Sequence, residues 1–229
     1  AGRATSCYLL DPGDGEALLV DLGPGALHRA AQHGFPPARL RAILLTHLHP
    51  DHCADLVALQ FALRVPVNVR DRPLPVYGHP DTALLVARLR NAWPGGLAAA
   101  PGRLPILPVA PGPLAPPLHG LEVRAAAIDH HPSSLAYRVE LPNGFQIAFS
   151  GDSAGGDALI ELARGADLFV LEASVPDDRP VRGHLTPRSA GRVAAAAGVR
   201  HVVLSHFYPA VLGEPIEARG REGFEGRVT

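Results

Sequence analysis

The chain has 229 residues, of which 47% are hydrophobic and 19% are charged, so it can bury the core of one domain or of two small ones. Its formal net charge of −1 excludes a strong overall attraction to nucleic acid or to an acidic membrane surface. No apolar run reaches the ~18 residues of a membrane span, and no signal peptide is visible. We therefore expect a cytoplasmic protein with one domain over residues 1–229 and no membrane partner. Because the sequence contains no Met, we expect a trimmed or incomplete N-terminus.

Short apolar runs alternate with helical patterns in the first half of the chain. Residues 42–45 of the predicted strand 41–46 are all apolar, so we expect this strand to be buried in the middle of a sheet. The predicted strands are 6–10, 17–21, 41–46 and 65–69, and the predicted helices are 25–34, 54–64 and 80–93.

The second half begins with residues 94–117, which are rich in Pro, Gly and Ala and predict a long surface loop rather than a domain linker. Asn143-Gly144 predicts a tight hairpin turn between two strands, and Thr186 followed by Pro187 predicts the start of a helix. The predicted strands are 121–128, 135–141, 145–150, 167–173 and 201–205, the last being the final clear strand, and the predicted helices are 157–165 and 186–198. This order indicates mixed sheets covered by helices.

A dense group of polar residues follows the apolar run at 41–46. The stretch "THLHPDH" places His47, His49, Asp51 and His52 within six residues. Neutral imidazoles and a carboxylate are ligands that suit zinc, manganese or iron. A solvated polar loop is the alternative, and a buried strand directly before the group disfavours it. Four ligands cannot complete two metal shells, so further ligands are expected elsewhere.

Candidate ligands recur directly after other predicted strands. His130 and His131 follow one strand in "IDHHPSS", Asp152 follows another in "FSGDS", and His206 follows a third in "LSHFYP". A loop at a strand end is a place where side chains from separate strands can converge. The recurrence of this context therefore predicts a metal site built from several loops.

These motifs, in this order, resemble those of the metallo-β-lactamase-fold hydrolases. The pair Tyr137-Arg138, "LEAS" and "GHLT" resemble the branch that contains ribonuclease Z, arylsulfatases and small cyclic-nucleotide phosphodiesterases. The resemblance implies an α/β fold, a four-layer αββα sandwich of two mixed sheets flanked by helices. The family usually has one more strand at each end, so we expect the C-terminus to be shortened as well.

The resemblance also implies two divalent ions, with Zn²⁺ first and Mn²⁺ or Fe as alternatives. The family's third histidine usually precedes the Arg of the Tyr-Arg pair by eight residues, which favours His130 and leaves His131 as the alternative. The implied ligands are His47, His49 and His130 for one ion, Asp51, His52 and His206 for the other, and Asp152 for both.

For the mechanism we expect a hydroxide that bridges the two ions to attack phosphorus, with Asp51 also orienting the hydroxide's proton. His184 lies 22 residues before His206, as the corresponding histidine does in the ribonuclease Z branch. It is the candidate proton donor to the leaving oxygen, and Glu172 is the candidate that orients it. The alternative is that His184 is an exposed loop histidine.

The substrate we expect is a small phosphodiester, with a cyclic nucleotide as the leading case. The arm that clamps tRNA in ribonuclease Z is inserted between the third histidine and the bridging aspartate, but here the 21 residues between His130 and Asp152 form the predicted hairpin. Leu171 also replaces the histidine of the branch's His-Glu-Ala-Thr motif. Ribonuclease Z-like cleavage of tRNA, arylsulfatase or lactonase activity, and a metal-binding module without catalysis remain alternatives.

The resemblance to the family also suggests that the protein forms a homodimer.

The two cysteines, Cys7 and Cys53, show no zinc or redox spacing, so we expect buried thiols rather than a disulfide.

Overall fold

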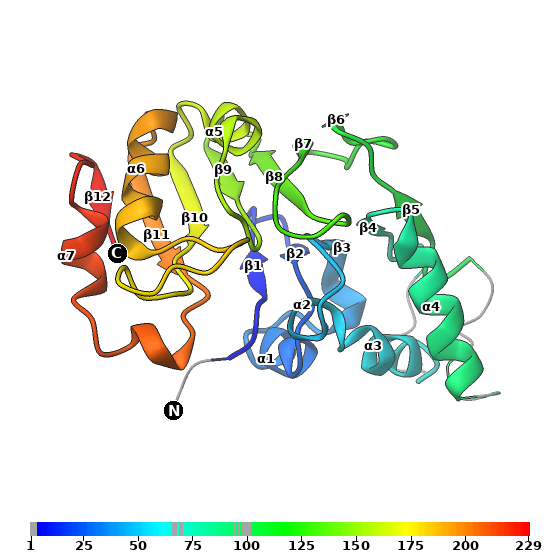
Figure 1. Ribbon diagram of the computed structural model, residues 1–229. Helices are drawn as coiled ribbons and strands as arrows, with labels where there is room; N and C mark the ends of the chain where they lie inside the picture. Colours follow the sequence, from blue (N-terminus) through cyan, green and yellow to red (C-terminus); the bar gives the residue numbers. More distant parts are fainter. Residues whose placement is uncertain (1–3, 66–67, 69–70, 94, 96, 98–101) are drawn as a thin grey trace. The chain divides into compact units, whose positions relative to one another are not determined.

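The computed structural model describes residues 4–65, 68, 71–93, 95, 97 and 102–229 (Figure 1). Its backbone contacts divide the chain into two compact units, Ala1–Val109 and Ala110–Thr229. Each unit contains one β-sheet, and each has its own cluster of buried hydrophobic side chains.

The sheet of the first unit has five strands in the order β1-β2-β3-β4-β5. β1 pairs with β2 antiparallel, and the remaining neighbours are parallel. β3 therefore lies in the middle of the sheet, as its apolar residues 42–44 predict. The strands are β1 (Tyr8–Leu10), β2 (Ala17–Val20), β3 (Leu40–Leu44), β4 (Val76–Gly78) and β5 (Ile106–Pro108).

Helices of the first unit cover a core that includes Leu19 of β2 and Ile43 of β3. Leu27, Leu59 and Val86 contribute to this core from three different helices. The helical elements are α1 (Ala26–Gln32), the 3₁₀ helix η1 (Pro37–Arg39), α2 (Pro50–Cys53), α3 (Leu56–Ala62) and α4 (Asp81–Ala92).

The sheet of the second unit has seven strands in the order β12-β11-β10-β9-β8-β7-β6. The strands from β9 to β12 pair in parallel, whereas those from β6 to β9 pair antiparallel. The strands are β6 (Gly112–Pro113), β7 (Glu122–Ala127), β8 (Leu135–Glu140), β9 (Gln146–Phe149), β10 (Leu168–Glu172), β11 (His201–Ser205) and β12 (Arg227–Val228).

The helices of this unit begin largely where the sequence predicts. Thr186 caps α6 through the backbone N–H of Ser189, and Ser189 bonds back to the backbone N–H of Thr186, which forms a capping box. Leu159, Val193 and Phe169 pack in the same core. The helical elements are α5 (Asp157–Ala163), α6 (Pro187–Ala197), the 3₁₀ helix η3 (Pro209–Val211) and α7 (Ile216–Gly220).

The structure corrects several local predictions. The segment 94–117 is not one long loop, because β5 and β6 lie within it, and the boundary between the units also falls there, after Val109. β11 is not the last strand, since α7 and β12 follow it and β12 pairs with β11. β4 was not predicted, and most of the strand predicted at 65–69 lies outside the described residues. β4, β5, β6 and β12 have only two or three residues each. Pairing with a neighbouring strand, rather than the local sequence pattern, therefore determines where they form.

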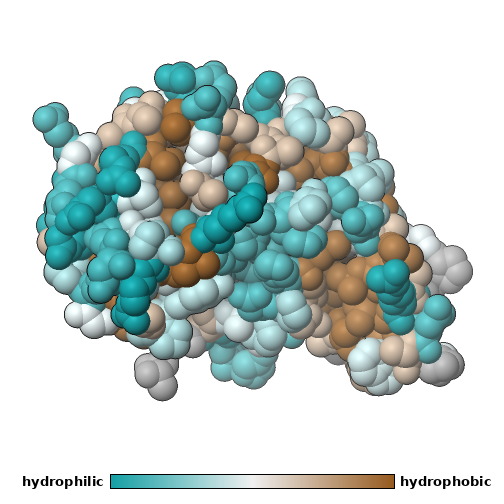
Figure 2. All heavy atoms as spheres, viewed as in Figure 1, coloured by the Kyte–Doolittle hydropathy of each residue, from teal (hydrophilic) through white to brown (hydrophobic). Residues whose placement is uncertain are grey.

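An apolar surface lies over α3 and α4 of the first unit, where Figure 2 shows hydrophobic side chains gathered. Phe61 of α3, Leu84 of α4 and Trp93, which directly follows α4, are large exposed hydrophobic side chains. Within the described part of the chain, every helix is too short or too polar to cross a membrane.

Candidate metal-binding residues and their surroundings

The first group of candidate ligands, cluster 1, consists of His47, His49, Asp51 and His52 in the first unit. It begins three residues after β3 ends, and Pro50 then starts the short helix α2, which the sequence analysis expected as loop. Proline suits a first helical position because its φ is already helical and its missing N–H has no role there. The short helix brings Asp51 and His52 back toward the end of β3.

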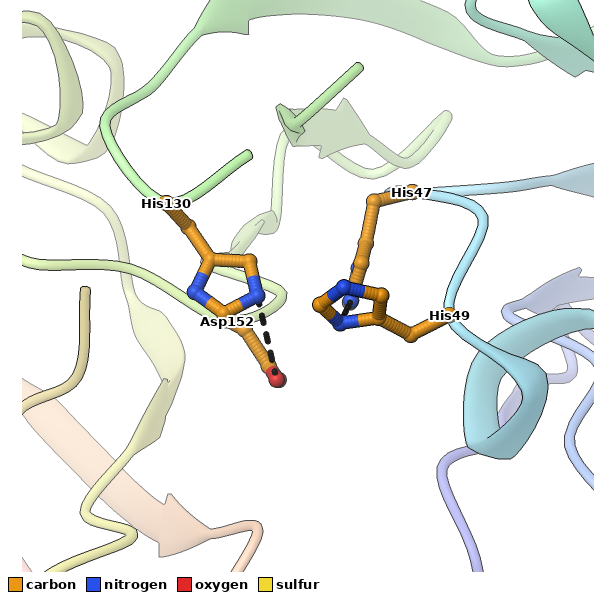
Figure 3. A group of neighbouring side chains, drawn as sticks. All are labelled: His47, His49, His130 and Asp152. Carbon is orange, nitrogen blue, oxygen red and sulfur yellow. Dashed lines mark hydrogen bonds and ion pairs between the residues drawn. The ribbon is translucent and has the colours of Figure 1, made fainter. Parts of the chain in front are cut away.

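The imidazoles of cluster 1 lie close together. Nε2 of His47 is 3.0 Å from Nδ1 of His49 (Figure 3), and Nε2 of His52 is 3.7 Å from Oδ2 of Asp51. His47 and His52 are each 1% exposed. Buried nitrogen atoms at these separations form a group of ligands that one loop can present to a cation.

Asp21 fixes the orientation of His52, a relationship that the sequence analysis did not identify. Its carboxylate is fully buried and accepts hydrogen bonds from Nδ1 of His52 at 2.7 Å and from the backbone N–H of Thr46 at 2.8 Å. Because Nδ1 carries the proton, Nε2 of His52 presents its lone pair to a metal. Asp21 directly follows the apolar strand β2, just as the candidate ligands follow other apolar strands. The same sequence pattern could therefore have identified Asp21 as a candidate site residue.

The second group, cluster 2, consists of His130, Asp152, His184 and His206 in the second unit. The two oxygens of Asp152 face different histidines. Oδ1 lies 3.3 Å from Nε2 of His206, and Oδ2 lies 3.7 Å from Nε2 of His130 (Figure 3). Asp152 is 2% exposed. A carboxylate with one oxygen toward each of two ligand atoms suits a bridge between two cations.

The other ring nitrogen of each cluster 2 histidine has an acceptor. Nδ1 of His130 donates to the backbone carbonyl of Gly183 at 2.9 Å. Nδ1 of His206 donates to Oγ of Ser174 at 2.9 Å, and that hydroxyl donates to Glu172. These bonds leave the Nε2 lone pairs available as ligands. By contrast, Nδ1 of His131 lies 2.8 Å from Oγ of Ser133 in its own turn.

Glu172, at the end of β10, connects several parts of cluster 2. Its buried carboxylate accepts from Nδ1 of His184 at 3.0 Å, from the backbone N–H of Ser153 at 2.7 Å and from the backbone N–H of Leu185 at 3.2 Å. It also accepts from both the backbone N–H and the hydroxyl of Ser174. The predicted contact between Glu172 and His184 is therefore present. Ser174, which was not predicted as a site residue, joins Glu172 to His206.

The donor atoms of both clusters fit divalent cations, because they are imidazole nitrogens and carboxylate oxygens with oriented lone pairs. Within cluster 2, the three residues Asp152, His184 and His206 offer ligand atoms that all lie within 4.8 Å of one another. This proximity leaves His184 with two possible roles, as a proton donor or as a ligand.

Both cysteines are free thiols; Cys53 is buried, as expected, whereas Cys7 is only partly buried. Sγ of Cys53 donates to the backbone carbonyls of Leu48 and His49. Burial, followed by the charges of Asp21 and Asp51, raises the pKa of Cys53 to about 12. The thiol therefore packs behind the cluster 1 loop.

Comparisons with known proteins place the chain in a family. A family model described as the beta-lactamase superfamily domain matches residues 8–207. An uncharacterised protein of Mycobacterium leprae is 34% identical over 226 residues, which cover 97% of this chain and 78% of that protein. A ribonuclease Z of Mycolicibacterium paratuberculosis is 34% identical over 239 residues, which cover 93% of this chain and 85% of that protein.

The structural comparison agrees with this assignment. The crystal structure of the metallo-β-lactamase fold protein YhfI from Bacillus subtilis matches with a TM-score of 0.84 and 26% identity, covering 100% of this chain and 89% of that chain. The predicted fold class, with two mixed sheets flanked by helices, is confirmed. The chain therefore belongs to the β-lactamase superfamily and has the metallo-β-lactamase fold.

Proposed function

We propose that the chain is a metal-dependent hydrolase of small phosphodiesters, in which clusters 1 and 2 together supply one centre for two divalent ions. The observation that carries the proposal is the position of Asp152, whose two oxygens face His130 and His206 separately. Membership of the superfamily supports the hydrolase class. The ligands we propose are His47, His49 and His130 for one ion, Asp51, His52 and His206 for the other, and Asp152 for both.

When bound, the two ions would polarise the phosphoryl oxygen and lower the pKa of water, so that a nucleophile forms at neutral pH. Zn²⁺ is the first candidate, since histidine and carboxylate ligands suit it, and Mn²⁺ and Fe suit the same ligands. We further propose that Asp51 orients the attacking water, because Asp51 is a carboxylate on the cluster 1 loop.

His184 is the residue we propose as proton donor to the leaving oxygen. The Glu172 carboxylate accepts from Nδ1 of His184, so Nε2 is the nitrogen that would hold and deliver the proton. Glu172 is thus a positioning residue, and His184 is the catalytic residue that it holds.

The substrate proposed first is a cyclic nucleotide. β8 and β9 occupy most of the segment between His130 and Asp152 as an antiparallel hairpin, so a tRNA-binding arm has no place there. Leu171 is fully buried in the core of the second unit, where it replaces the motif histidine of ribonuclease Z. Both observations favour a small substrate over a folded RNA.

Cleavage of precursor tRNA is the second candidate, because the relative named ribonuclease Z is 34% identical over most of both chains. Aryl sulfates and lactones are further candidates on the same ligands, since a fold does not fix a substrate. The non-enzymatic alternative is a module that binds metal without catalysing a reaction.

A substrate panel tests these candidates on protein loaded with Zn²⁺ or Mn²⁺. The panel contains cyclic nucleotides, bis(p-nitrophenyl) phosphate, an aryl sulfate, a lactone and precursor tRNA. We expect turnover of the phosphodiesters, abolished by Asp152→Ala and His130→Ala and retained in the matched control His131→Ala. Full metal occupancy without turnover of any ester would favour the module. A homodimer also remains a prediction, which light scattering would test.

A further inference from the structure

The segment after β11 places the ring of Tyr208 beside His206 of cluster 2. His206 has φ 56, which is uncommon for a residue other than glycine and marks a constrained turn. Phe207 packs against the core of the second unit. The residues on either side of Phe207 come together instead, and the rings of His206 and Tyr208 have centroids 5.4 Å apart. The turn therefore places Tyr208 beside a proposed metal ligand.

Tyr208 also lies against the proposed proton donor. Its ring centroid is 5.3 Å from that of His184, and its hydroxyl is 3.4 Å from Nε2 of His184. A hydrogen bond of this length is weak, and a substrate oxygen that came closer to Nε2 would form a stronger one. Tyr208 thus borders the one nitrogen through which His184 would act.

The position of Tyr208 is fixed by the backbone although its side chain reaches solvent. Its N–H donates to the carbonyl of Ser174, and its own carbonyl accepts from the N–H of Val211 at the end of η3. The residue is 40% exposed. A ring that already packs against the rings of His184 and His206 loses little conformational entropy when a ligand packs against it.

We propose that Tyr208 is a specificity-determining residue that packs against a planar group of the substrate, either a nucleobase or an aryl group. This inference rests on the proposed function. A leaving oxygen that takes a proton from His184 must come within hydrogen-bond distance of Nε2. The group attached to that oxygen then lies near the Tyr208 ring, and aromatic rings favour planar partners. The substrate class is accordingly a phosphodiester with an aromatic substituent.

The experiment compares adenosine 5′-monophosphate with ribose 5-phosphate, which has the same phosphate and sugar but no base. Dissociation constants are measured by calorimetry on the metal-loaded full chain. We expect the wild type to bind the nucleotide about tenfold more tightly than the sugar phosphate. Tyr208→Leu should abolish this preference, whereas Tyr208→Phe, which keeps the ring, should retain it. Phe145→Leu is the matched control, because Phe145 is also 40% exposed but lies in the β8–β9 hairpin.

Kinetics provide a second readout with adenosine 3′,5′-cyclic phosphate. Tyr208→Leu should raise KM about tenfold and leave kcat within about twofold. An unchanged base preference in Tyr208→Leu would overturn the proposal, as would a fall in kcat with no change in KM. If Tyr208→Leu does not fold, Tyr208→Gln carries the same comparison. If the wild type hydrolyses no phosphodiester, the proposed function fails, and the binding comparison still decides the role of Tyr208.

Discussion

Nδ1 of His184 lies 3.0 Å from Oε1 of Glu172, and the same carboxylate reaches His206 through the hydroxyl of Ser174. One buried acid therefore positions both a proposed metal ligand and the proposed proton donor. Substitution of His184 can distinguish its two proposed roles, because loss of a metal ligand lowers the metal content, whereas loss of a proton donor lowers turnover alone.

Replacement of His184 by alanine should lower kcat by about 10²–10⁴-fold, the usual contribution of a general acid, and leave the metal content unchanged. The measurements are steady-state kinetics and elemental analysis of the same preparation. Loss of one metal equivalent would show instead that His184 is a ligand, and unchanged turnover would remove it from the mechanism.

Replacement of Glu172 by alanine leaves several buried donors without their acceptor, so it should lower the free energy of unfolding by at least ~3 kcal/mol. Glu172→Gln retains the shape of the side chain and one carbonyl oxygen, and should be the milder change. Urea unfolding of the metal-free proteins measures the difference. Equal stability of Glu172→Ala and the wild type would contradict the role given to Glu172.

Glu172 and His184 should also be coupled in catalysis. Because Glu172 holds His184 and also reaches His206 through Ser174, we expect Glu172→Gln to lower kcat less in the His184→Ala background than in the wild type. The test is a double-mutant cycle on kcat with one phosphodiester. Fully additive losses in the double variant would show that Glu172 does not act through His184.

Gly23 supports the cluster 1 loop from β2's side. A Cβ atom at this position would lie 2.1 Å from the backbone oxygen of Asp51 and 2.9 Å from that of Ser6. Gly23→Ala must therefore displace the loop, and we expect metal affinity to fall at least tenfold, as it does when the groups that orient metal ligands are disturbed. Gly213→Ala is the control, since a Cβ there meets nothing within 4 Å. Equal metal affinities of the two variants would argue against this support.

Cys7 should react slowly with alkylating agents in the folded protein. Burial is the largest cause that raises its pKa from 9.0 to about 12, and the charges of Asp21 and Asp55 act in the same direction. Because the thiolate is the reactive form, the folded protein at pH 8 should react about a thousandfold more slowly at Cys7 than the unfolded chain. Mass spectrometry of the Cys7 peptide after iodoacetamide treatment measures both rates, and similar rates would be inconsistent with a raised pKa.

The candidate ligands were accessible from the sequence because each follows an apolar strand. His47 has this context in the first unit, and His130, Asp152 and His206 have it in the second, where the topology of one sheet explains why their loops converge. The hydrogen-bond partners were harder to predict. Ser174 contacts His206, which lies 32 positions further along the chain, and Tyr208 contacts His184, which lies 24 positions before it. Such contacts between loops depend on strand register.

Short strands set the other limit of sequence-based prediction. β4, β5 and β6 have two or three residues each, and β5 and β6 lie in a segment rich in Pro and Gly. No periodicity can develop over so few residues, so their pairing partners determine them. Long or cleanly bounded elements such as α4 and α6 were predictable because their N-terminal prolines mark where they start.

The central claim is that Asp152 joins ligands from both clusters in one centre for two metals. Elemental analysis and turnover of bis(p-nitrophenyl) phosphate, measured on the wild type and on Asp152→Ala, test it most directly. The account predicts two equivalents of divalent metal in the wild type, and at most one in Asp152→Ala with no measurable turnover. Two tightly bound equivalents together with undiminished turnover in Asp152→Ala would contradict it.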